Sequence, residues 1–324
     1  MDILIPQALL QVTEKANLYK TTERPEYFFS DQLTAHYDPS SHAIWSRWTP
    51  SPRPSFNLDL LKDLASYCRF VSNTGATIDC LGEAMRVEYT VLASGAPGVF
   101  NLGGDLDLFI ELIEQRDRAG LLQYGKSCIY VLYHNYRGHD LPVTTISLIQ
   151  GECLGGGFEA ALSSDIVIAE KHSRFGFPEI LFNLFPGMGA YSFLDRRVGR
   201  RVTEDLLSTG KICSADDMLA MGVIDHVVDS GQGEVEVAAL IKRDRRRGNG
   251  LVGIAAARRR VNGITYQELM DVVHLWVDAA LRLTIRDIRL MQRLVSRQND
   301  ILMSRPCHGV GPRQSDILAS DQIH

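Results

Sequence analysis

The alternation of apolar and polar positions predicts two similar strand–glycine–helix units in the middle of the chain. In the first, the apolar run 87–94 predicts a strand, and VFNLGGD (99–105) leads into the helical pattern DLDLFIELIEQ. In the second, the apolar run 143–149 predicts a strand that ends before Gly151, and the glycines 155–157 lead into the helical FEAAL. Backbone N–H groups at a helix start have no partner within the helix, and glycine lets a ligand approach closely. Each turn can therefore hold a negatively charged oxygen.

The region before these units predicts a β-hairpin and a helix. Residues 33–37 and 43–48 have strand-like patterns and are separated by the turn signal DPSS. Asn57 can cap the helix that follows, and Leu61 and Leu64 fall on one face of it. This face is expected to pack on the core.

The region after them continues the alternation of strands and helices. The pattern predicts a strand at 165–169 and a helix over 193–207. Ser214 caps a further helix with Asp217 at the capping-box position, and a strand follows at 222–228. The order of elements indicates an α/β protein.

Beyond a polar hinge, DSGQG, the chain becomes helical and basic. The capping box TYQE (265–268) opens a helix whose apolar face includes Leu269, Val273 and Trp276, and the apolar pattern resumes over 288–295. Trp276 is either a core residue, which we favour slightly, or part of a substrate pocket. We expect four parts: an N-terminal extension, a core, a helical C-terminal cap and a loose tail, at 1–35, 36–233, 234–304 and 305–324.

Two glutamates follow the second glycine turn in otherwise apolar surroundings. Glu159 comes directly after the glycines, and Glu179 stands in the sequence FPEI. Each feature alone has a structural explanation, because a glycine turn often serves packing and the helix dipole favours a glutamate near a helix start. Together they indicate a site in which two carboxylates act beside backbone N–H groups.

These residues resemble the crotonase (enoyl-CoA hydratase/isomerase) superfamily. Its signature is a glycine-rich turn followed by Glu, then a second Glu in a PE-I/L context before a P-G-x-G loop, here PGMG at 186–189. FNLGGD resembles the family's first glycine turn, F-x-x-G-x-D. The resemblance covers roughly 55–231. It implies a spiral core of ββα units with a helical C-terminal cap that helps to join subunits, commonly into trimers or dimers of trimers.

The resemblance also implies roles for particular residues. The backbone N–H groups of Gly104 and Gly156 would form an oxyanion hole for a thioester carbonyl, and Glu159 and Glu179 would be the catalytic acid and base. The substrate pocket would include Leu154, Gly155 and Trp276. Adding or removing water across a double bond needs two such groups, so the pair favours hydration or dehydration over isomerisation.

Within the superfamily, the sequences of several segments resemble bacterial diffusible-signal-factor synthases more closely than β-oxidation hydratases. This likeness extends from about Tyr37 to Val295. These segments include QGECLGGGFEAALSSDIVIAE and PEILFNLFPGMGAYSF. This likeness implies dehydration of a 3-hydroxyacyl thioester, on acyl carrier protein or CoA, and thioester hydrolysis that releases an unsaturated fatty-acid signal. Two alternatives stay open: a catabolic enoyl-CoA hydratase or isomerase, and a regulatory protein that binds a sensor kinase.

Composition excludes several other classes. Among 324 residues, 45% are hydrophobic and the net charge is −5, which is ordinary for a globular protein and unfavourable for nucleic-acid binding. No apolar run is long enough for a membrane span and the N-terminus lacks a secretory pattern, so we expect a cytoplasmic protein. The cysteines form no C-x-x-C pair, and we expect no metal site and no cofactor.

Two further features have both a functional and a structural explanation. Cys153 precedes the glycines and could be a nucleophile, but no nearby histidine would activate it, so a small buried side chain is favoured. The arginines within 196–201 and 242–260 would suit an acidic carrier protein or the phosphates of a carrier, although such runs are more often solvated surfaces.

Overall fold

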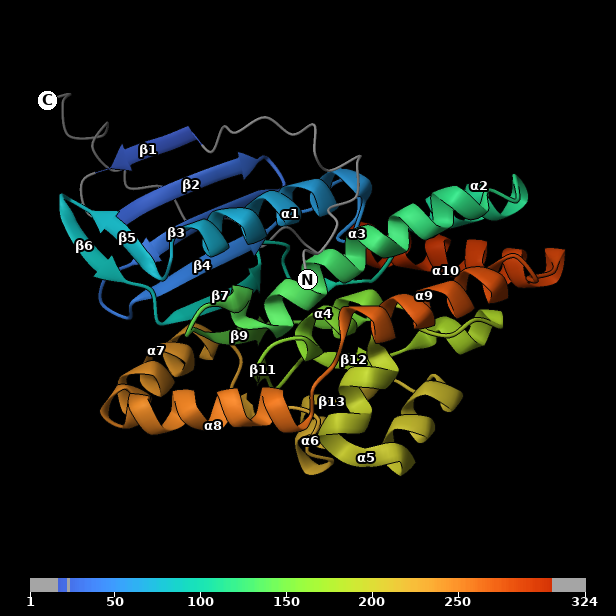
Figure 1. Ribbon diagram of the computed structural model, residues 1–324. Coiled ribbons are helices and arrows are strands. Elements are labelled where there is room, and N and C mark those ends of the chain that lie inside the picture. Colours follow the sequence, from blue (N-terminus) through green and yellow to red (C-terminus); the bar gives the residue numbers. More distant parts are fainter. Residues whose placement is uncertain (1–16, 22–23, 305–324) are drawn as a thin grey trace, which may run out of the picture.

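The computed structural model describes residues 17–21 and 24–304, and a sheet of eight strands forms its largest layer (Figure 1). Strands β1 to β4 pair antiparallel with one another in turn, and β4, β7, β9, β11 and β14 run parallel. In spatial order the strands are β1 (Asn17–Thr21), β2 (Arg24–Ser30), β3 (Leu33–Asp38), β4 (Ala43–Trp48), β7 (Tyr89–Ser94), β9 (Thr144–Ile149), β11 (Ile166–Glu170) and β14 (His226–Val228).

A second sheet of four short strands brings the two glycine turns together. Its spatial order is β13 (Cys213–Ser214), β12 (Arg174–Gly176), β10 (Glu152–Leu154) and β8 (Val99–Asn101). Because β8 and β10 are parallel neighbours, the turns that follow them lie at the same edge of this sheet. A hairpin of β5 (Thr77–Cys80) and β6 (Glu83–Arg86) stands apart from both sheets.

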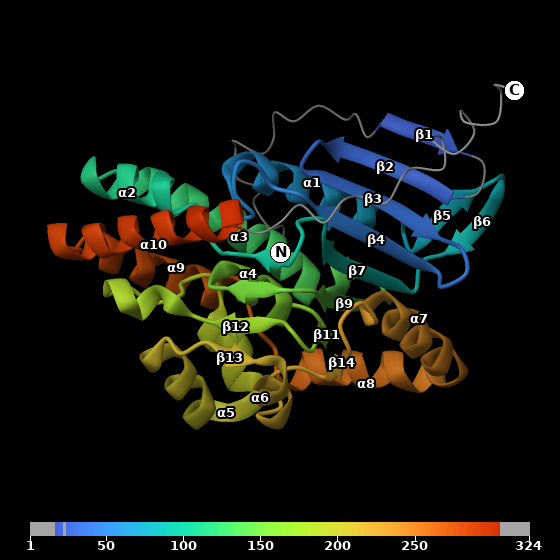
Figure 2. The same cartoon turned by 180° about the vertical axis from the view of Figure 1, so that it is seen from behind.

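Helices cover both faces of the large sheet. On one face, α1 (Leu58–Asn73) contacts β2 and β3 and packs against α3 (Arg118–Tyr136). On the other, α7 (Gly233–Asp244) contacts β9 and β11, and its Val237, Leu240 and Ile241 are buried with side chains of those strands (Figure 2). The short 3₁₀ segment η4 (Arg245–Arg247) links α7 to α8 (Gly248–Val261).

The remaining helices build up the side of the molecule that bears the second sheet. The C-terminal helices α9 (Tyr266–Ala280) and α10 (Ile285–Ser304) pack beside α3 and α2 (Leu106–Glu114), respectively (Figure 1). The other segments are η2 (Gly138–Asp140), α4 (Gly156–Leu162), η3 (Pro178–Phe182), α5 (Ala190–Thr209) and α6 (Ala215–Ala220). The protein is thus a mixed α/β fold with a helical C-terminal region, as the sequence predicted.

Several local predictions are confirmed. The hairpin is β3 and β4, and Asn57 Oδ1 caps α1 by accepting the Leu60 N–H at 2.8 Å. The capping box of Ser214 and Asp217 forms in both directions. The predicted helix 193–207 is part of the longer α5, which Gly199 interrupts with a φ of 75°.

Three segments differ from the prediction. The sequence left residues 1–35 as an extension, but 24–30 form β2, which pairs with β3 in the large sheet. The strand expected at 222–228 is shortened to β14. At α9 only half of the capping box forms: Thr265 accepts the Glu268 N–H, while the Glu268 carboxylate accepts from Ser192 and Arg196 instead. A tertiary ion pair has replaced the local contact.

Two other predictions concern membrane-spanning helices and metal sites. Within residues 17–21 and 24–304, no helix combines the length and apolar character that crossing a membrane requires. The same part of the chain contains no cluster of His, Cys, Asp and Glu side chains that could hold a metal ion. The predicted tail, 305–324, lies outside the described residues.

Candidate active site

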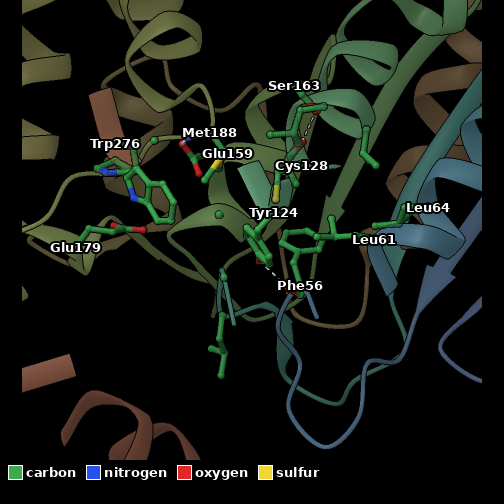
Figure 3. Close-up of a pocket in the computed structure, with 18 of the residues that line it drawn as sticks. Phe56, Leu61, Leu64, Tyr124, Cys128, Glu159, Ser163, Glu179, Met188 and Trp276 are labelled. Atoms are coloured by element: carbon green, nitrogen blue, oxygen red, sulfur yellow. Dashed lines mark hydrogen bonds between the residues drawn. The ribbon is translucent and has the colours of Figure 1, made fainter. Parts of the chain in front are cut away.

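An apolar cavity lies between α1, α3 and α4 on one side and η3 and α9 on the other (Figure 3). Gly104, Gly156, Glu159, Glu179 and Trp276 all line it, so the structure brings five of the seven predicted site residues together. The other two, Leu154 and Gly155, are not among the lining residues. Most of the remaining lining consists of apolar and aromatic side chains, which suits an acyl chain.

The two glycine turns touch each other at the wall of this cavity. A Cβ built on Gly103 would lie 3.1 Å from the Gly156 nitrogen, and one built on Gly156 would lie 3.5 Å from the Gly104 nitrogen. Gly103 itself has a φ of 102°, which a residue with a side chain rarely adopts. The glycines therefore allow two main-chain segments to approach where side chains would separate them.

The N–H groups of the residues beside Gly104 have hydrogen-bond partners, whereas Gly104 and Gly156 present their own N–H groups at this wall. Gly103 N–H donates to Asn101 Oδ1 at 2.8 Å, and Asp105 N–H donates to the Tyr124 hydroxyl at 3.3 Å. Gly156 is the first residue of α4, where a backbone N–H has no partner within the helix. A pair of such donors can stabilise an oxyanion.

Glu159 is held at the cavity by main-chain donors from another segment. Its side chain is 1% exposed, and Oε1 accepts the N–H of Met188 at 2.8 Å and of Ala190 at 2.9 Å. Burial raises the pKa of Glu159 from 4.5 to about 7, and these two hydrogen bonds oppose the rise because they favour the charged form. The carboxyl group can therefore ionise near neutral pH.

Glu179 is presented by η3 and lies against the second glycine turn. A Cβ on Gly155 would lie 2.4 Å from Glu179 Oε1, so this glycine makes room for the carboxyl group rather than for substrate. Oε2 is buried and has no hydrogen-bond partner within the described chain. Burial raises the pKa of Glu179 from 4.5 to about 8, and the negative charge of Glu159 raises it further. Glu179 is thus mostly protonated at neutral pH.

Trp276 is both a core residue and part of the cavity wall. Its side chain is 2% exposed, and its ring lies edge-on to Phe109 with 5.1 Å between the ring centroids. A Cβ on Gly187 would lie 2.3 Å from the indole, so the predicted P-G-x-G loop approaches Trp276 through a glycine. The two alternatives that the sequence left open are therefore compatible.

Cys153 has the features of a structural side chain. It is fully buried, and burial raises its pKa well above the usual value, which keeps the thiol protonated. It is also absent from the cavity lining. These observations agree with the small buried side chain that the sequence favoured.

Sequence reasoning missed Tyr124, which supports the first glycine turn from α3. Its hydroxyl donates to Phe56 O at 2.6 Å and accepts the Asp105 N–H, and the ring lines the cavity. A tyrosine within a helix gives no local signal of this role, since it depends on how α3 packs against the turn.

Many of the arginines singled out in the sequence have internal partners. Arg196 pairs with Glu268 at 2.8 Å, and Arg197 pairs with Asp225 at 3.2 Å. Arg258 and Arg259 both pair with the buried Asp165. These side chains serve the packing of α5 and α8, and Arg245 pairs with Glu88 at 3.5 Å, whereas Lys242, Arg246 and Arg247 are exposed at the surface.

The chain is similar to known proteins in both sequence and structure. Residues 76–246, more than half of the chain, match the family model described as enoyl-CoA hydratase/isomerase. An enoyl-CoA hydratase from Bacillus halodurans has a similar structure at 20% sequence identity, with a TM-score of 0.68 over 81% of this chain and 100% of that chain.

Two further solved structures share the fold. Human mitochondrial delta3-delta2-enoyl-CoA isomerase is 19% identical, with a TM-score of 0.69 over 84% of this chain and 99% of that chain. Pseudomonas aeruginosa DspI is 22% identical, with a TM-score of 0.60 over 72% and 81%. The core has the crotonase fold, and the chain belongs to the enoyl-CoA hydratase/isomerase family.

Proposed function

We propose that the protein dehydrates a 3-hydroxyacyl thioester to a 2-enoyl thioester and then hydrolyses the thioester to release an unsaturated fatty acid that acts as a signal. The observation that carries the proposal is the pair of carboxyl groups, Glu159 and Glu179, with raised pKa values and different hydrogen-bond surroundings in one cavity with two backbone N–H donors. Isomerisation needs one base, whereas removal of water needs an acid as well.

The different environments of the two glutamates assign their roles in dehydration. Glu159, whose anion is stabilised by two N–H groups, removes the α-proton as the base. Glu179, whose Oε2 has no hydrogen-bond partner in the described structure, is the protonated acid and gives its proton to the leaving hydroxyl group. The C–H electron pair forms the enolate, the Cβ–O bond breaks, and water leaves as the double bond forms.

The N–H groups of Gly104 and Gly156 would bind the thioester oxygen as it becomes negatively charged in this step. Loss of one such donor typically costs about a hundred- to a thousand-fold in rate. The same donors would serve hydrolysis: a glutamate takes a proton from water, which attacks the carbonyl carbon, and the oxyanion forms in the same place. The C–S bond then breaks as the carbonyl re-forms, and the glutamate passes the proton to the sulfur to release the carrier thiol. No cofactor is needed for either step.

Substrate assays separate this reaction from its nearest alternative, a catabolic enoyl-CoA hydratase or isomerase. The protein is incubated with 3-hydroxyacyl carrier protein, with the matching 3-hydroxyacyl-CoA and with crotonyl-CoA, and products are identified by mass spectrometry. Release of a free 2-enoic acid supports the proposal. Hydration of crotonyl-CoA without any released acid would support the catabolic alternative.

Partners remain part of the proposal. An acyl carrier protein is acidic as a class, and exposed Lys242, Arg243, Arg246 and Arg247 offer a basic surface for it. Assembly into a homo-oligomer, a trimer or a dimer of trimers, follows from the family resemblance, and so does a sensor-kinase partner. If the double variant Glu159→Ala with Glu179→Ala kept the cellular phenotype, the regulatory alternative would replace the enzymatic one.

A further inference from the structure

The cavity continues beyond the two glutamates to a part with a different character. In Figure 3 it passes from Trp276 and Glu179, past Tyr124 and Cys128, toward Leu64 on α1. Three buried polar side chains also line the cavity, and we call them the inner polar group: Tyr67 on α1, which also bears Leu64, His139, whose ring contacts that of Tyr67, and Asn135. The proposed reaction uses none of them.

The orientation of the Asn135 amide is fixed by its partners. Ser163 Oγ donates to Ala160 O at 2.7 Å, so it must accept the hydrogen bond from Asn135 Nδ2 at 2.9 Å. The second Nδ2 hydrogen goes to Ser164 Oγ at 3.0 Å. The amide oxygen Oδ1 is then left buried without a hydrogen-bond partner in the described part of the chain.

His139 offers both a donor and an acceptor. Its side chain is 1% exposed, and neither ring nitrogen has a hydrogen-bond partner among the described residues. Burial lowers the pKa of His139 to about 3, so the imidazole is neutral, with one N–H and one bare nitrogen. The residue sits in a left-handed turn between Gly138 and Asp140 with a φ of 57°, a conformation rare for a non-glycine residue.

Tyr67 completes the group from the opposite helix. Its ring lies edge-on to that of His139, with 6.0 Å between the ring centroids. The Ser46 side chain lies close enough to the Tyr67 hydroxyl to act on its pKa through hydrogen bonding, but no hydrogen bond of good geometry joins this hydroxyl to a described residue. Tyr67 adds a second group that can donate as well as accept.

Buried polar groups without well-formed hydrogen bonds are unfavourable, so three of them around one cavity indicate a polar occupant. We propose that the inner polar group is a recognition site for a neutral hydroxyl group carried on the distal part of the acyl chain. A hydroxyl can donate to Asn135 Oδ1 or to the bare nitrogen of His139, and it can accept from the imidazole N–H or from Tyr67. This inference rests on the proposed function because it takes the occupant of the cavity to be an acyl chain.

Other occupants fit less well. A charged group would be buried without a counter-ion, since no arginine or lysine lines the cavity within the described residues. A plain hydrocarbon chain would leave all three polar side chains unpaired. Ser163, which binds Asn135, is the C-cap residue of α4 and stands four residues after Glu159, about 6 Å along the helix axis. The recognised hydroxyl therefore lies away from the reacting carbons.

A binding experiment tests this site without relying on turnover. Isothermal titration calorimetry compares straight-chain fatty acids of increasing length, each unsubstituted or hydroxylated at successive distal carbons. We expect one position, or two adjacent ones, to lower Kd about tenfold relative to the plain acid, because a site built for a hydroxyl rejects the analogue that lacks it. Equal Kd values for the plain and hydroxylated acids at every position, the result expected if an ordered water fills the site, would overturn the inference. The inference would also be overturned if neither kind of acid bound.

Matched variants test whether the inner polar group is the source of the preference for the hydroxylated acid. Tyr67→Phe removes one hydroxyl and keeps the ring, and it should reduce the preference about threefold. His139→Phe should reduce it further. Tyr130→Phe is the control, because Tyr130 is buried on α3 outside the cavity lining. This variant should prefer the hydroxylated acid to the same extent as the wild type. An undiminished preference in both Tyr67→Phe and His139→Phe would also overturn the inference. A protein that prefers the hydroxylated acid but converts no thioester would contradict the proposed reaction alone.

Discussion

Glu159 and Glu179 share one cavity, yet the chain holds the two carboxyl groups in different ways. The anion of Glu159 receives two main-chain hydrogen bonds from the loop before α5. Glu179 lies against a glycine, and its buried Oε2 has no partner within the described residues. Both pKa values are raised by burial, but that of Glu179 is raised more. In the proposed mechanism, main-chain donors rather than the residue type therefore distinguish the base, Glu159, from the acid, Glu179.

The largest effect is expected from removing the base. Glu159→Gln keeps the shape of the side chain but cannot accept the α-proton, so kcat/KM for dehydration should fall about a hundred- to ten-thousand-fold. Discontinuous or continuous assays of the enoyl product measure kcat/KM. The control is Glu114→Gln, on the exposed part of α2. Activity within tenfold of the wild type would remove Glu159 from the mechanism.

A smaller effect is expected from moving the acid without changing it. In Gly155→Ala the new Cβ would meet Glu179 Oε1 at 2.4 Å, so the carboxyl group must shift, and a misplacement of this size can cost about a hundred-fold in rate. Gly75→Ala is the matched control: its φ of 55° is close to the 50° of Gly155, and nothing lies within 4 Å of its Cβ. Both variants carry the strain of a side chain at positive φ, and Gly155→Ala adds the contact with Glu179, so only Gly155→Ala should lose activity.

The smallest effect concerns stability, and its sign follows from the raised pKa. Below about pH 4 Glu179 is protonated in both folded and unfolded protein, so it contributes no penalty. As pH rises from the unfolded value of 4.5 to the folded value of about 8, the unfolded state ionises first and the folded state loses stability. Glu179→Gln should therefore raise the free energy of unfolding by roughly 1–4 kcal/mol above pH 8. Denaturant titrations at acidic and alkaline pH measure the difference, which should vanish at the acidic end.

The reaction end of the cavity was largely predictable from the sequence, because its signals are local. Gly104, Gly156, Glu159 and Glu179 each belong to a short motif with a glycine turn or a proline beside it. Gly155 was assigned to the pocket but supports Glu179 instead, since only the fold shows which side of the turn a Cβ would occupy.

The inner end of the cavity was not predictable. Asn135 and His139 come at the end of a helix with no motif around them, and their position depends on how α3 packs against α1 and α4. The pairing of Glu268 with Arg196 and the strand β2 are similar cases, because a distant partner decided each of them. Local patterns specify turns and caps, whereas contacts between distant elements specify the rest.

The most direct test of the central claim is the pH dependence of kcat/KM for dehydration in the wild type and in Glu179→Gln. With an ionised Glu159 as base and a protonated Glu179 as acid, the wild-type profile should be bell-shaped, rising near pH 7 and falling near pH 8. In Glu179→Gln the alkaline fall should disappear from the residual activity while the acidic rise remains. An unchanged alkaline fall in that variant, or a flat wild-type profile across this range, would contradict the assignment of the two glutamates.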